Sequence, residues 1–465
     1  MLAAWLKPLE RRYGLDLRSL ALLRLGLALV ILCDVWMCLG DVLAYSDRGE
    51  VPRRLLKELW LPGYWSIHAL SGSVWWQLVC FAIAILSALL MLIGYRTRWA
   101  TVIGWIMLVS VHNRNPFMVS AADDVLRAMM FWGMFLPLGS SYSVDQALNM
   151  SPMPQPKRIF TGATVGLMAQ QSYIYLASAL SQTLIAGHSG VTVLAWIGPL
   201  LLWSPIKTDL CRLLVVGLII LVHIGGALTL NSGLLTLLAT VSCCTWLVFI
   251  PSSVWARWTA RAFTPKQLGL KIYYDAECGF CKKVVHLLRT FLVLPRRVPL
   301  QIAQSDPVIQ TAMETQNSWV IVDWQGQHHY KWQGIAYVVS LSPIFHPLAR
   351  ILRWSPLMTA GTRLYETIAN NRRFAGNFTK PFTYQSFTVR SASFLSLIPL
   401  MILVFTALLN LRSIAADVAL ANPPQRLLQQ VTHNPAVKIL MPLGQAARLD
   451  QSWRIFTPPT LPNDD

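Results

Sequence analysis

The chain has 465 residues, of which 54% are hydrophobic and 13% are charged, and its mean hydropathy is +0.47. Soluble domains carry about a quarter charged residues, so the composition excludes an ordinary water-soluble enzyme. Lysine and arginine number 39 against 21 acidic residues, which gives a net charge of +18. In so apolar a chain this excess indicates contact with anionic lipid headgroups rather than with nucleic acid. The sequence therefore predicts a polytopic α-helical membrane protein.

Nine apolar segments predict membrane-spanning helices, because a bilayer core takes about 20 residues per helix. They cover 20–39, 74–93, 100–112, 125–138, 161–186, 191–203, 213–230, 234–250 and 394–411. Arg24 and Asp34 interrupt the first segment and no small-residue cleavage site follows it, so we do not expect a cleavable signal peptide. The domains we expect are a multi-helix transmembrane domain at 1–255, a soluble domain at 268–390, a single transmembrane helix at 394–411 and a C-terminal tail at 412–465.

The basic residues of the short loops predict the orientation of these spans. If the N-terminus is cytoplasmic, 13 lysines and arginines lie in the inner segments and five in the outer loops. Eight crossings then return the soluble domain to the cytoplasm, and the ninth sends the tail outside. We expect a multi-pass protein of a bacterial inner membrane.

The region after the eighth segment changes character and predicts a small α/β domain. Strands are expected at 271–274, 318–323 and 329–332, with a hairpin turn at 325–327, and helices at 282–294, 335–341, 347–353 and 358–370.

Two cysteines lie between the first strand and the first helix of this domain, in the run Asp275-Ala-Glu-Cys278-Gly-Phe-Cys281. At this spacing they are able to form a disulfide. The first faces the unpaired N–H groups and the positive dipole end of the helix, which favours thiolate over thiol and lowers its pKa. Lys282 and Lys283 add positive charge. The pattern predicts that Cys278 attacks a disulfide and Cys281 resolves the mixed disulfide.

Two other interpretations of the pair stay open. The first is half of a zinc site, for which four ligands are expected and His286, His328 and His329 are the nearby candidates. The second is an inert turn. A haem attachment would need a histidine where Lys282 stands. We expect redox chemistry and no metal.

The run Tyr274–Cys281 resembles the signature of the DCC family of thiol–disulfide oxidoreductases, over roughly 270–380. The resemblance extends to Gln333-Gly-Ile-Ala336 and to the helix 364–373, which is similar to the family's Tyr…Ala-x-Asn-Arg helix. It implies a thioredoxin-like fold. It also implies a catalytic-site role for Asp275, which orients the cysteine loop or accepts a proton; a helix-capping role is the alternative.

The chain departs from that pattern at two places. The family's common glycine after the aspartate is Ala276. Thioredoxin-like sites place a cis-proline before the strand facing the cysteines, whereas Asn317 and Ser318 stand there. The position that would orient a substrate is therefore unspecified.

The first half resembles the horizontally transferred transmembrane domain related to vitamin K-dependent γ-carboxylase, over roughly 15–255. The matching stretches are Arg24-Leu-Gly26…Asp34, Tyr45-Ser-Asp47-Arg-Gly49…Pro52, His112-Asn-Arg114, Asp123-Asp124-Val-Leu-Arg127…Phe135-Leu-Pro137-Leu-Gly139…Val144-Asp145 and Tyr173–Ala179. In the carboxylase the last stretch leads into a lysine pair, one of which is the base. Here Ser181 and Gln182 stand at those positions, and neither is a base near neutral pH. We therefore expect no carboxylase activity.

The function we expect is that of a membrane-anchored thiol–disulfide oxidoreductase with no cofactor beyond its redox-active cysteine pair. Its partners would be membrane lipids and a protein thiol, disulfide or reductant, and not nucleic acid. Polar residues at membrane depth, such as Gln170, Gln171 and His223, indicate either interhelical hydrogen bonds or an interior pocket for a quinone or lipid. The alternative function is a non-catalytic membrane binding or scaffold protein.

Overall fold

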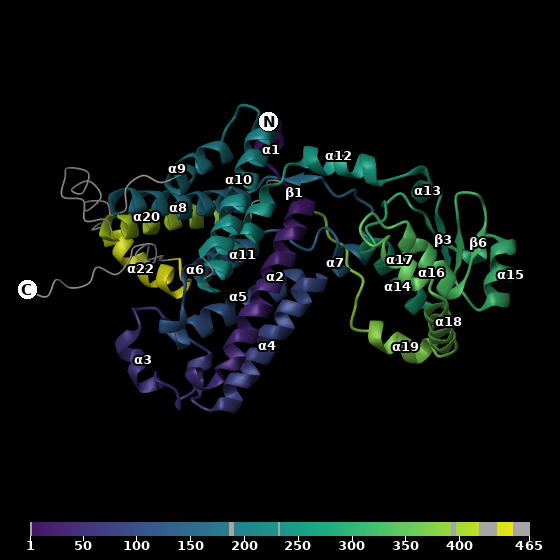
Figure 1. Cartoon of the computed structure of the whole chain (residues 1–465), viewed down its shortest axis with the longest axis horizontal. Coiled ribbons are helices and arrows are strands. Elements are labelled where there is room, and N and C mark those ends of the chain that lie inside the picture. The colour runs from purple at the N-terminus through teal and green to yellow at the C-terminus, as the bar shows by residue number, and fades with distance from the viewer. Residues whose placement is uncertain (1, 186–189, 231–232, 392–396, 418–434, 450–465) are drawn as a thin grey trace, which may run out of the picture. The chain divides into compact units, whose positions relative to one another are not determined.

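The computed structural model describes the chain except residues 1, 186–189, 231–232, 392–396, 418–434 and 450–465 (Figure 1). The chain divides into two compact units. Unit 1 comprises Met1–Leu138, Pro156–Ser252 and Val389–Asp465, and unit 2 comprises Gly139–Gln155 and Ser253–Thr388. We describe each unit by itself.

Unit 1 is almost entirely helical. Its α-helices are α1 (Leu2–Tyr13), α2 (Leu17–Gly40), α3 (Arg53–Leu59), α4 (Val74–Ile93), α5 (Thr97–Arg114), α6 (Ala121–Gly133), α8 (Gly162–Ile185), α9 (Gly190–Leu202), α10 (Thr208–Leu230), α11 (Gly233–Trp246), α20 (Leu397–Asp417) and α22 (Pro435–Ala446). Short 3-10 helices η1 (Val42–Tyr45), η2 (His68–Leu70), η3 (Pro116–Met118) and η4 (Leu247–Phe249) and the paired strands β1 (Leu15–Asp16) and β2 (Arg158–Ile159) complete it.

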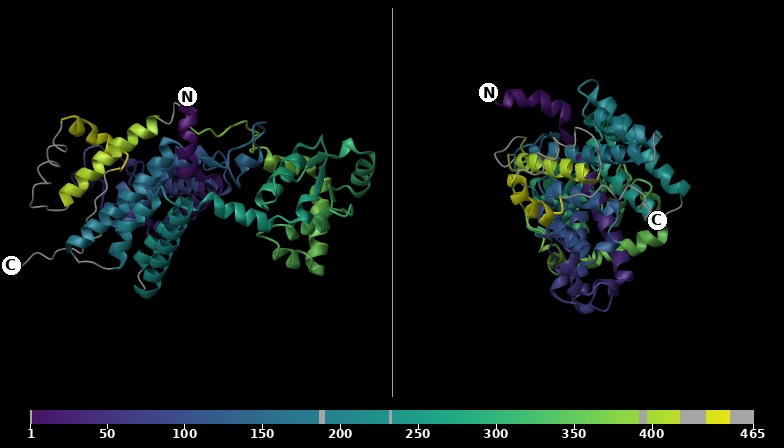
Figure 2. Two further views of the ribbon diagram at one scale, coloured as in Figure 1. Left: turned by 90° about the horizontal axis from the view of Figure 1, so that it is seen from above. Right: turned by 90° about the vertical axis from the view of Figure 1, so that its left-hand side faces the viewer.

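Helix α2 lies at the centre of the packing in unit 1, where it contacts α4 and α11. Leu20, Leu23 and Leu27 on α2 have no exposed surface. Gly26 lets α11 approach closely, because a Cβ atom there would lie 2.7 Å from Cβ of Cys244. Helix α20 runs beside α8, as Figure 2 shows, although the two are far apart in sequence. The unit is thus held together by helices from both ends of the chain.

Three helices of the described chain are long and apolar enough to cross a membrane: Leu17–Gly40, Val74–Ile93 and Thr208–Thr229. A fourth would result if Thr236–Phe249 and Ser252–Ala262, which meet at a bend of 83°, acted together. Each of the nine expected segments overlaps a helix. Helix α5 is less apolar than its centre suggests, because Arg98 and His112-Asn-Arg114 occupy its ends. The number of crossings stays a prediction.

Unit 2 is built on a four-stranded mixed sheet in the order β4-β3-β5-β6. The strands are β3 (Lys271–Tyr274), β4 (Leu300–Ile302), β5 (Val320–Val322) and β6 (His328–His329). Strand β3 is parallel to β4 and antiparallel to β5, which is antiparallel to β6. Its helices are α7 (Val144–Ala147), α12 (Ser252–Ala262), α13 (Pro265–Leu268), α14 (Gly279–Phe291), η5 (Ala303–Ser305), α15 (Pro307–Gln316), α16 (Lys331–Ser340), α17 (Leu348–Leu352), α18 (Ser355–Asn370) and α19 (Arg372–Thr379).

The period-two alternation of β3 places helices on both faces of this sheet. Ile272 packs in one core with Val285 of α14 and with residues of α16. Its neighbour Tyr273 packs on the other side with Ile309 and Met313 of α15. The cysteine run at the end of β3 is therefore held between a fully packed strand and a packed helix.

The structure corrects several boundaries within the α/β domain: α16 and α18 begin at Lys331 and Ser355, before the expected 335 and 358, and β4 and α15 were not expected. Helix α14 begins at Gly279, three residues before the expected start. The third strand was expected to reach residue 332, which is wrong, because β6 ends at His329 and α16 begins at Lys331. The backbone N–H of Lys331 donates to Oγ of Ser318 at 2.7 Å and its φ is +48°, so the chain turns there.

Residues 139–155 join unit 2 from a distant part of the chain. Gln385 N–H donates to the Leu148 carbonyl at 3.1 Å, and Met150 N–H donates to the Gln385 carbonyl at 2.8 Å. The side chain of Asn149 donates to the Phe387 carbonyl and accepts from the Phe387 N–H, at 2.9 and 3.1 Å. Helix α7 contacts α14. No motif in the sequence marks this association.

Candidate redox site

The cysteine pair lies at the junction of β3 and α14, as its spacing predicted. Cys278 is the N-cap residue of α14, and its Sγ accepts a hydrogen bond from the Cys281 N–H at 3.2 Å. The two cysteines form a disulfide with a Cα–Cα distance of 5.2 Å. Cys278 is partly exposed, whereas Cys281 is 2% exposed. A partner can therefore reach the first sulfur more readily than the second.

Helix α14 brings positive charge to the same end. The backbone N–H groups of its first turn lack helical partners and carry the positive end of the dipole. Lys283 in that turn donates its Nζ to the Thr379 carbonyl at 2.8 Å, and Nζ of Lys282 lies 5.5 Å from the ring of Tyr384. Both ammonium groups therefore contact the 379–384 segment.

Asp275 lies in the loop before the helix rather than at the helix cap. Its Oδ1 accepts from the Glu277 N–H at 3.1 Å and from Nε2 of Gln304 at 2.8 Å. Gln304 also accepts from the Ala276 N–H, at 3.2 Å through Oε1. One side chain from η5 therefore fixes two consecutive residues of the cysteine loop. Sequence reasoning missed Gln304, which no motif marks.

A second connection runs from the cysteine loop to α18 and α19. Nη1 of Arg372 lies 3.6 Å from Oδ2 of Asp275, and its Nη2 donates to Oδ1 of Asn317 at 2.6 Å. Asn317 in turn donates to Oδ1 of Asn370 at 2.9 Å. Asn317, which stands where thioredoxin-like sites have a cis-proline, is thus linked through Arg372 to Asp275 beside the cysteines. Arg372 lies in the 364–373 stretch that the sequence marked without giving it a role.

Ser318 and Tyr365 fix the start of β5. The Tyr365 hydroxyl accepts from the Trp319 N–H at 3.1 Å and lies 3.2 Å from Oγ of Ser318. Burial raises the pKa of the Tyr365 phenol, so it stays protonated. These hydrogen bonds have a structural role: they join α18 to the start of β5.

The three histidines considered as zinc ligands face different surroundings. His329 stacks on Tyr337 with ring centroids 4.2 Å apart, and its Nε2 lies 3.2 Å from Oδ2 of Asp323. His328 contacts the Tyr330 hydroxyl at 3.1 Å through Nδ1. Burial, with lesser effects of Arg289 and Lys282, lowers the pKa of His286 to about 4. Among the described residues, no group of three or more metal-ligating side chains with suitable spacing includes either cysteine.

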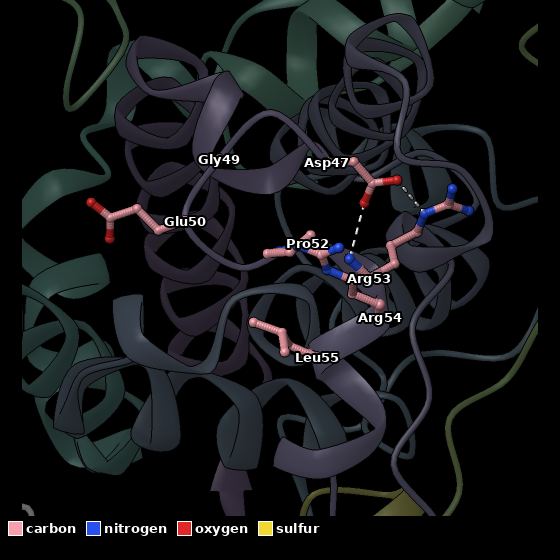
Figure 3. Close-up of a pocket in the computed structure, with 7 residues that line it drawn as sticks. All are labelled: Asp47, Gly49, Glu50, Pro52, Arg53, Arg54 and Leu55. Carbon is pink, nitrogen blue, oxygen red and sulfur yellow. Dashed lines mark hydrogen bonds and ion pairs between the residues drawn. The ribbon is translucent and has the colours of Figure 1, made fainter.

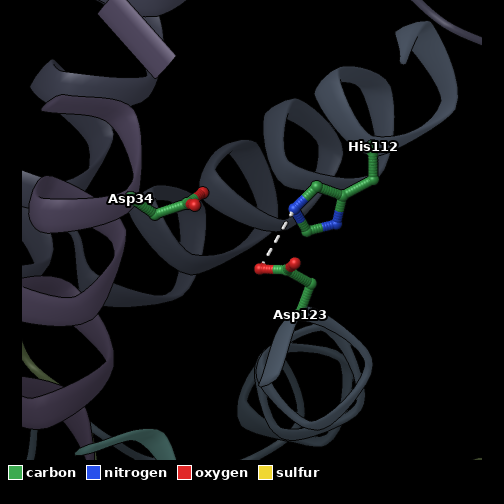
Figure 4. Close-up of side chains that lie close together, drawn as sticks. All are labelled: Asp34, His112 and Asp123. Carbon is green, nitrogen blue, oxygen red and sulfur yellow. Dashed lines mark ion pairs between the residues drawn. The ribbon is translucent and has the colours of Figure 1, made fainter. Parts of the chain in front are cut away.

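One such group lies in unit 1, where Asp34 of α2, His112 of α5 and Asp123 of α6 meet (Figure 4). Their ligand atoms lie within 4.8 Å of one another, and Nε2 of His112 is 3.6 Å from Oδ1 of Asp123. Nη1 of Arg127 is 2.7 Å from Nδ1 of His112. A guanidinium only donates, so Nδ1 accepts and the proton of the neutral ring sits on Nε2. That atom then faces the carboxylates as a donor, which suits a polar cluster within the helix bundle better than a metal site.

The polar residues of α8 bond to neighbouring helices. Oγ of Ser172 accepts from Nε1 of Trp203 at 2.9 Å, and Nε2 of Gln171 lies 3.4 Å from Oγ1 of Thr245. These contacts agree with the interhelical hydrogen-bonding interpretation. Ser181 and Gln182 belong to α8, but their side chains lie outside the described part of the structure.

A cavity of about 670 Å³ lies beside the loop that leads into α3, lined by residues from Asp47 to Leu55 (Figure 3). Asp47 accepts from the N–H and Nε of Arg53 at 3.0 and 2.9 Å. These charges satisfy each other, and the lining contains no cysteine. The cavity offers no chemistry that connects it to the redox pair.

Comparison with known families places the redox pair in context. Residues 272–376 match a family model described as DCC1-like thiol–disulfide oxidoreductase. This region carries a thiol–disulfide oxidoreductase domain. No curated protein and no solved structure matches the chain. The expected DCC resemblance is confirmed over these residues, and the resemblance of the first half to the carboxylase-related domain stays a prediction.

Proposed function

We propose that the protein is a membrane-anchored thiol–disulfide oxidoreductase in which Cys278 attacks and Cys281 resolves. One observation carries the proposal: the paired cysteines lie at the N-terminus of α14, with the first sulfur accessible and the second buried, inside the matched region. The strand order β4-β3-β5-β6, with the cysteines directly after β3, supports the thioredoxin-like fold that the resemblance implies.

The exchange balances without a further cofactor. The Cys278 thiolate attacks one sulfur of a partner disulfide, and the second partner sulfur leaves as a thiolate and takes a proton. Cys281 then loses its proton and attacks Sγ of Cys278, which forms the intramolecular disulfide and releases the partner as a dithiol. Two electrons pass to the partner, and a dithiol reductant restores the pair by the reverse steps. Asp275, held by Gln304 and Arg372, would orient the loop during both attacks.

The membrane part of the proposal rests on the three candidate spans, and its orientation on the eight crossings predicted before the soluble domain and the ninth after it. We place the redox unit in the cytoplasm and the C-terminal tail outside a bacterial inner membrane, because the basic residues are concentrated in the inner segments. Membrane lipids and a thiol or disulfide protein are the partners in this proposal. Quinone or lipid binding inside unit 1 would be an additional property that thiol exchange does not require.

Differential alkylation tests the redox function directly. Trypsin releases both cysteines, and no other, in the peptide 272–282. In glutathione buffers of graded potential, this peptide should shift between doubly alkylated and disulfide forms. Cys281→Ser should trap a glutathione adduct on Cys278, and Cys278→Ser should trap none. Cys211→Ser, which removes a cysteine of unit 1, is the control and should behave as wild type.

Two results would overturn the assignment. The first is a Cys278→Ser variant that accepts electrons from reduced thioredoxin as the wild type does, which would leave the non-catalytic scaffold as the better description. The second concerns orientation. Labelling of Cys278 in intact cells by a membrane-impermeant thiol reagent, scored on the same peptide, would show that unit 2 is not cytoplasmic.

A further inference from the structure

A row of apolar side chains lies exposed on unit 2. Leu348 and Ile351 lie three residues apart on α17, the spacing of one helix face, and Ile344 and Trp354 lie in the turns just before and after that helix. These four side chains, the apolar row, are 53, 47, 56 and 61% exposed, whereas Ala349 on the inner side is 3% exposed. Four large apolar side chains exposed within eleven residues point to a contact with another molecule or a membrane.

The charge around the apolar row identifies the chemistry of its partner. Arg350 and Arg353 lie exposed on α17 and directly after it. Arg363 is a third arginine of this part of the chain, whereas Lys331 is paired with Glu366 at 2.7 Å. Tryptophan and aliphatic side chains beside arginines are typical of protein surfaces that lie in the headgroup region of a bilayer. An anionic lipid surface satisfies both the apolar and the basic groups.

The chain joins unit 2 covalently to apolar helices of unit 1. The larger segment of unit 2, 253–388, follows α11 and η4 in the sequence and precedes α20. The first helix of that segment, α12, has no buried residue and combines Trp255 and Trp258 with Arg257 and Arg261. Because such tethers raise the effective concentration of the unit at the membrane, a surface of weak intrinsic affinity is sufficient to dock.

We infer that the apolar row and its flanking arginines form a membrane-contacting surface that docks unit 2 onto the anionic headgroups of the bilayer. This inference rests on the membrane anchoring proposed above but not on the redox chemistry. Docking would restrict the orientations in which Cys278 meets its partners. It would also bury a surface that otherwise favours aggregation.

Site-specific photo-crosslinking in the full-length protein tests the inference. The crosslinker p-benzoylphenylalanine replaces Ile351 in nanodiscs of phosphatidylcholine with or without phosphatidylglycerol. Val308 on α15, 69% exposed but outside the row, is the matched control, and Leu86 on α4, 58% exposed, reports whether the candidate spans contact lipid. We expect lipid adducts at 351 and 86 and few at 308. Arg350→Gln with Arg353→Gln should lower labelling at 351 roughly tenfold in anionic discs, because each basic residue near the surface strengthens binding.

The outcomes separate this inference from the proposed function. No lipid adduct at Leu86 would contradict membrane anchoring itself, and the inference would fall with it. Adducts at Leu86 without adducts at Ile351 would overturn only the docking surface. Adducts of Ile351 with a second copy of the chain would show that the row is a dimer interface instead. Equal labelling at Val308 and Ile351 would mean that lipid contact is not specific to the row.

Discussion

Gln304 is the residue whose contribution to the redox site is easiest to isolate, because it touches the cysteine loop without carrying chemistry. Its amide joins Asp275 and the Ala276 N–H, both of which lie just before Cys278. A hydrogen bond contributes about 0.5–1.5 kcal/mol net, and two bonds on an exposed side chain act near the lower end. Gln304 thus orders the loop rather than driving the reaction.

Gln304→Leu should therefore slow reaction of the Cys278 thiolate with glutathione disulfide by about 3- to 10-fold, since a loosened loop costs roughly one kcal/mol of positioning. Stopped-flow formation of the mixed disulfide in a Cys281→Ser background measures this rate. The control is Gln301→Leu on the neighbouring strand, which should change little. An unchanged rate in Gln304→Leu would show that the loop keeps its geometry without the amide.

His286 makes the stability of unit 2 depend on pH. Its folded pKa is about 4, against an ordinary value of 6.5, because the ring is buried and Arg289 and Lys282 repel a charge there. The unfolded chain therefore binds more protons between these two values, and stability falls as the pH drops through this window. At pH 7 the ring is neutral in the folded state and mostly neutral in the unfolded state, so little stability is lost.

Between pH 7 and pH 5 this effect should cost the wild type about 1 kcal/mol, with allowance for the solvent that still reaches the ring. His286→Asn should lose about 1 kcal/mol less stability than the wild type between pH 7 and pH 5. Pulse alkylation of the buried Cys281 in urea, in a Cys278→Ser background, gives the unfolding midpoint at each pH. His346→Asn, which changes an exposed histidine, serves as the control. Parallel losses in all three proteins would contradict the assignment to His286.

At the scale of elements, two helical glycines of unit 2 predict opposite effects of the same substitution. Gly361 of α18 faces Trp332 of α16, and a Cβ atom there would overlap the indole ring. Gly376 of α19 has no heavy atom within 4 Å of such a Cβ position. Alanine is favoured over glycine in a helix by about 0.5–1 kcal/mol, so only the first site opposes it.

Gly361→Ala should destabilise unit 2 by about 1–2 kcal/mol, because the overpacking cost exceeds the gain in helix propensity. Gly376→Ala should stabilise it by about 0.5 kcal/mol. The urea midpoint from Cys281 pulse alkylation measures both variants. A stabilising Gly361→Ala would mean that α16 and α18 separate easily, and the close contact would not be a fixed part of the fold.

Local patterns predicted the elements that lie next to one another in sequence. Strand β3, the cysteine turn, α14 and the β5–β6 hairpin all follow from alternation, helical spacing and turn residues. The end of β6 was mistaken because the residues up to Trp332 look strand-like, whereas Ser318 fixes the turn at Lys331 from thirteen residues away. Gln304 and Arg372 could not be predicted, since their roles depend on partners brought near only by the folded sheet.

At the scale of the whole molecule, the membrane interpretation depends on apolar side chains that point outward. Leu86 is 58% exposed near the middle of α4, although α4 is one of the most apolar helices of the described chain. Such exposure is unfavourable in water over a whole helix face and favourable in lipid. The exposed apolar side chains of unit 1 therefore support the membrane interpretation as directly as its apolar core.

Leu86→Arg should raise the cost of membrane insertion by about 2.5–3.5 kcal/mol, because a charge would face the hydrocarbon core. The fraction of protein that resists alkaline carbonate extraction should fall accordingly. Leu59→Arg on α3, an exposed apolar position outside the candidate spans, should be tolerated. Equal tolerance at residue 86 would show that α4 does not cross the bilayer.

Because residues 139–155 belong to unit 2, the redox unit cannot be moved to another protein as a single segment. This piece is synthesised first, then a run of helices of unit 1, and only afterwards the segment 385–387 to which it bonds. A graft that carried 253–388 alone into another scaffold would leave Gln385 and Phe387 without the backbone and amide groups of Leu148, Asn149 and Met150. A single cut in the gene therefore cannot separate unit 2 from unit 1, because residues 139–155 of unit 2 lie inside the sequence of unit 1.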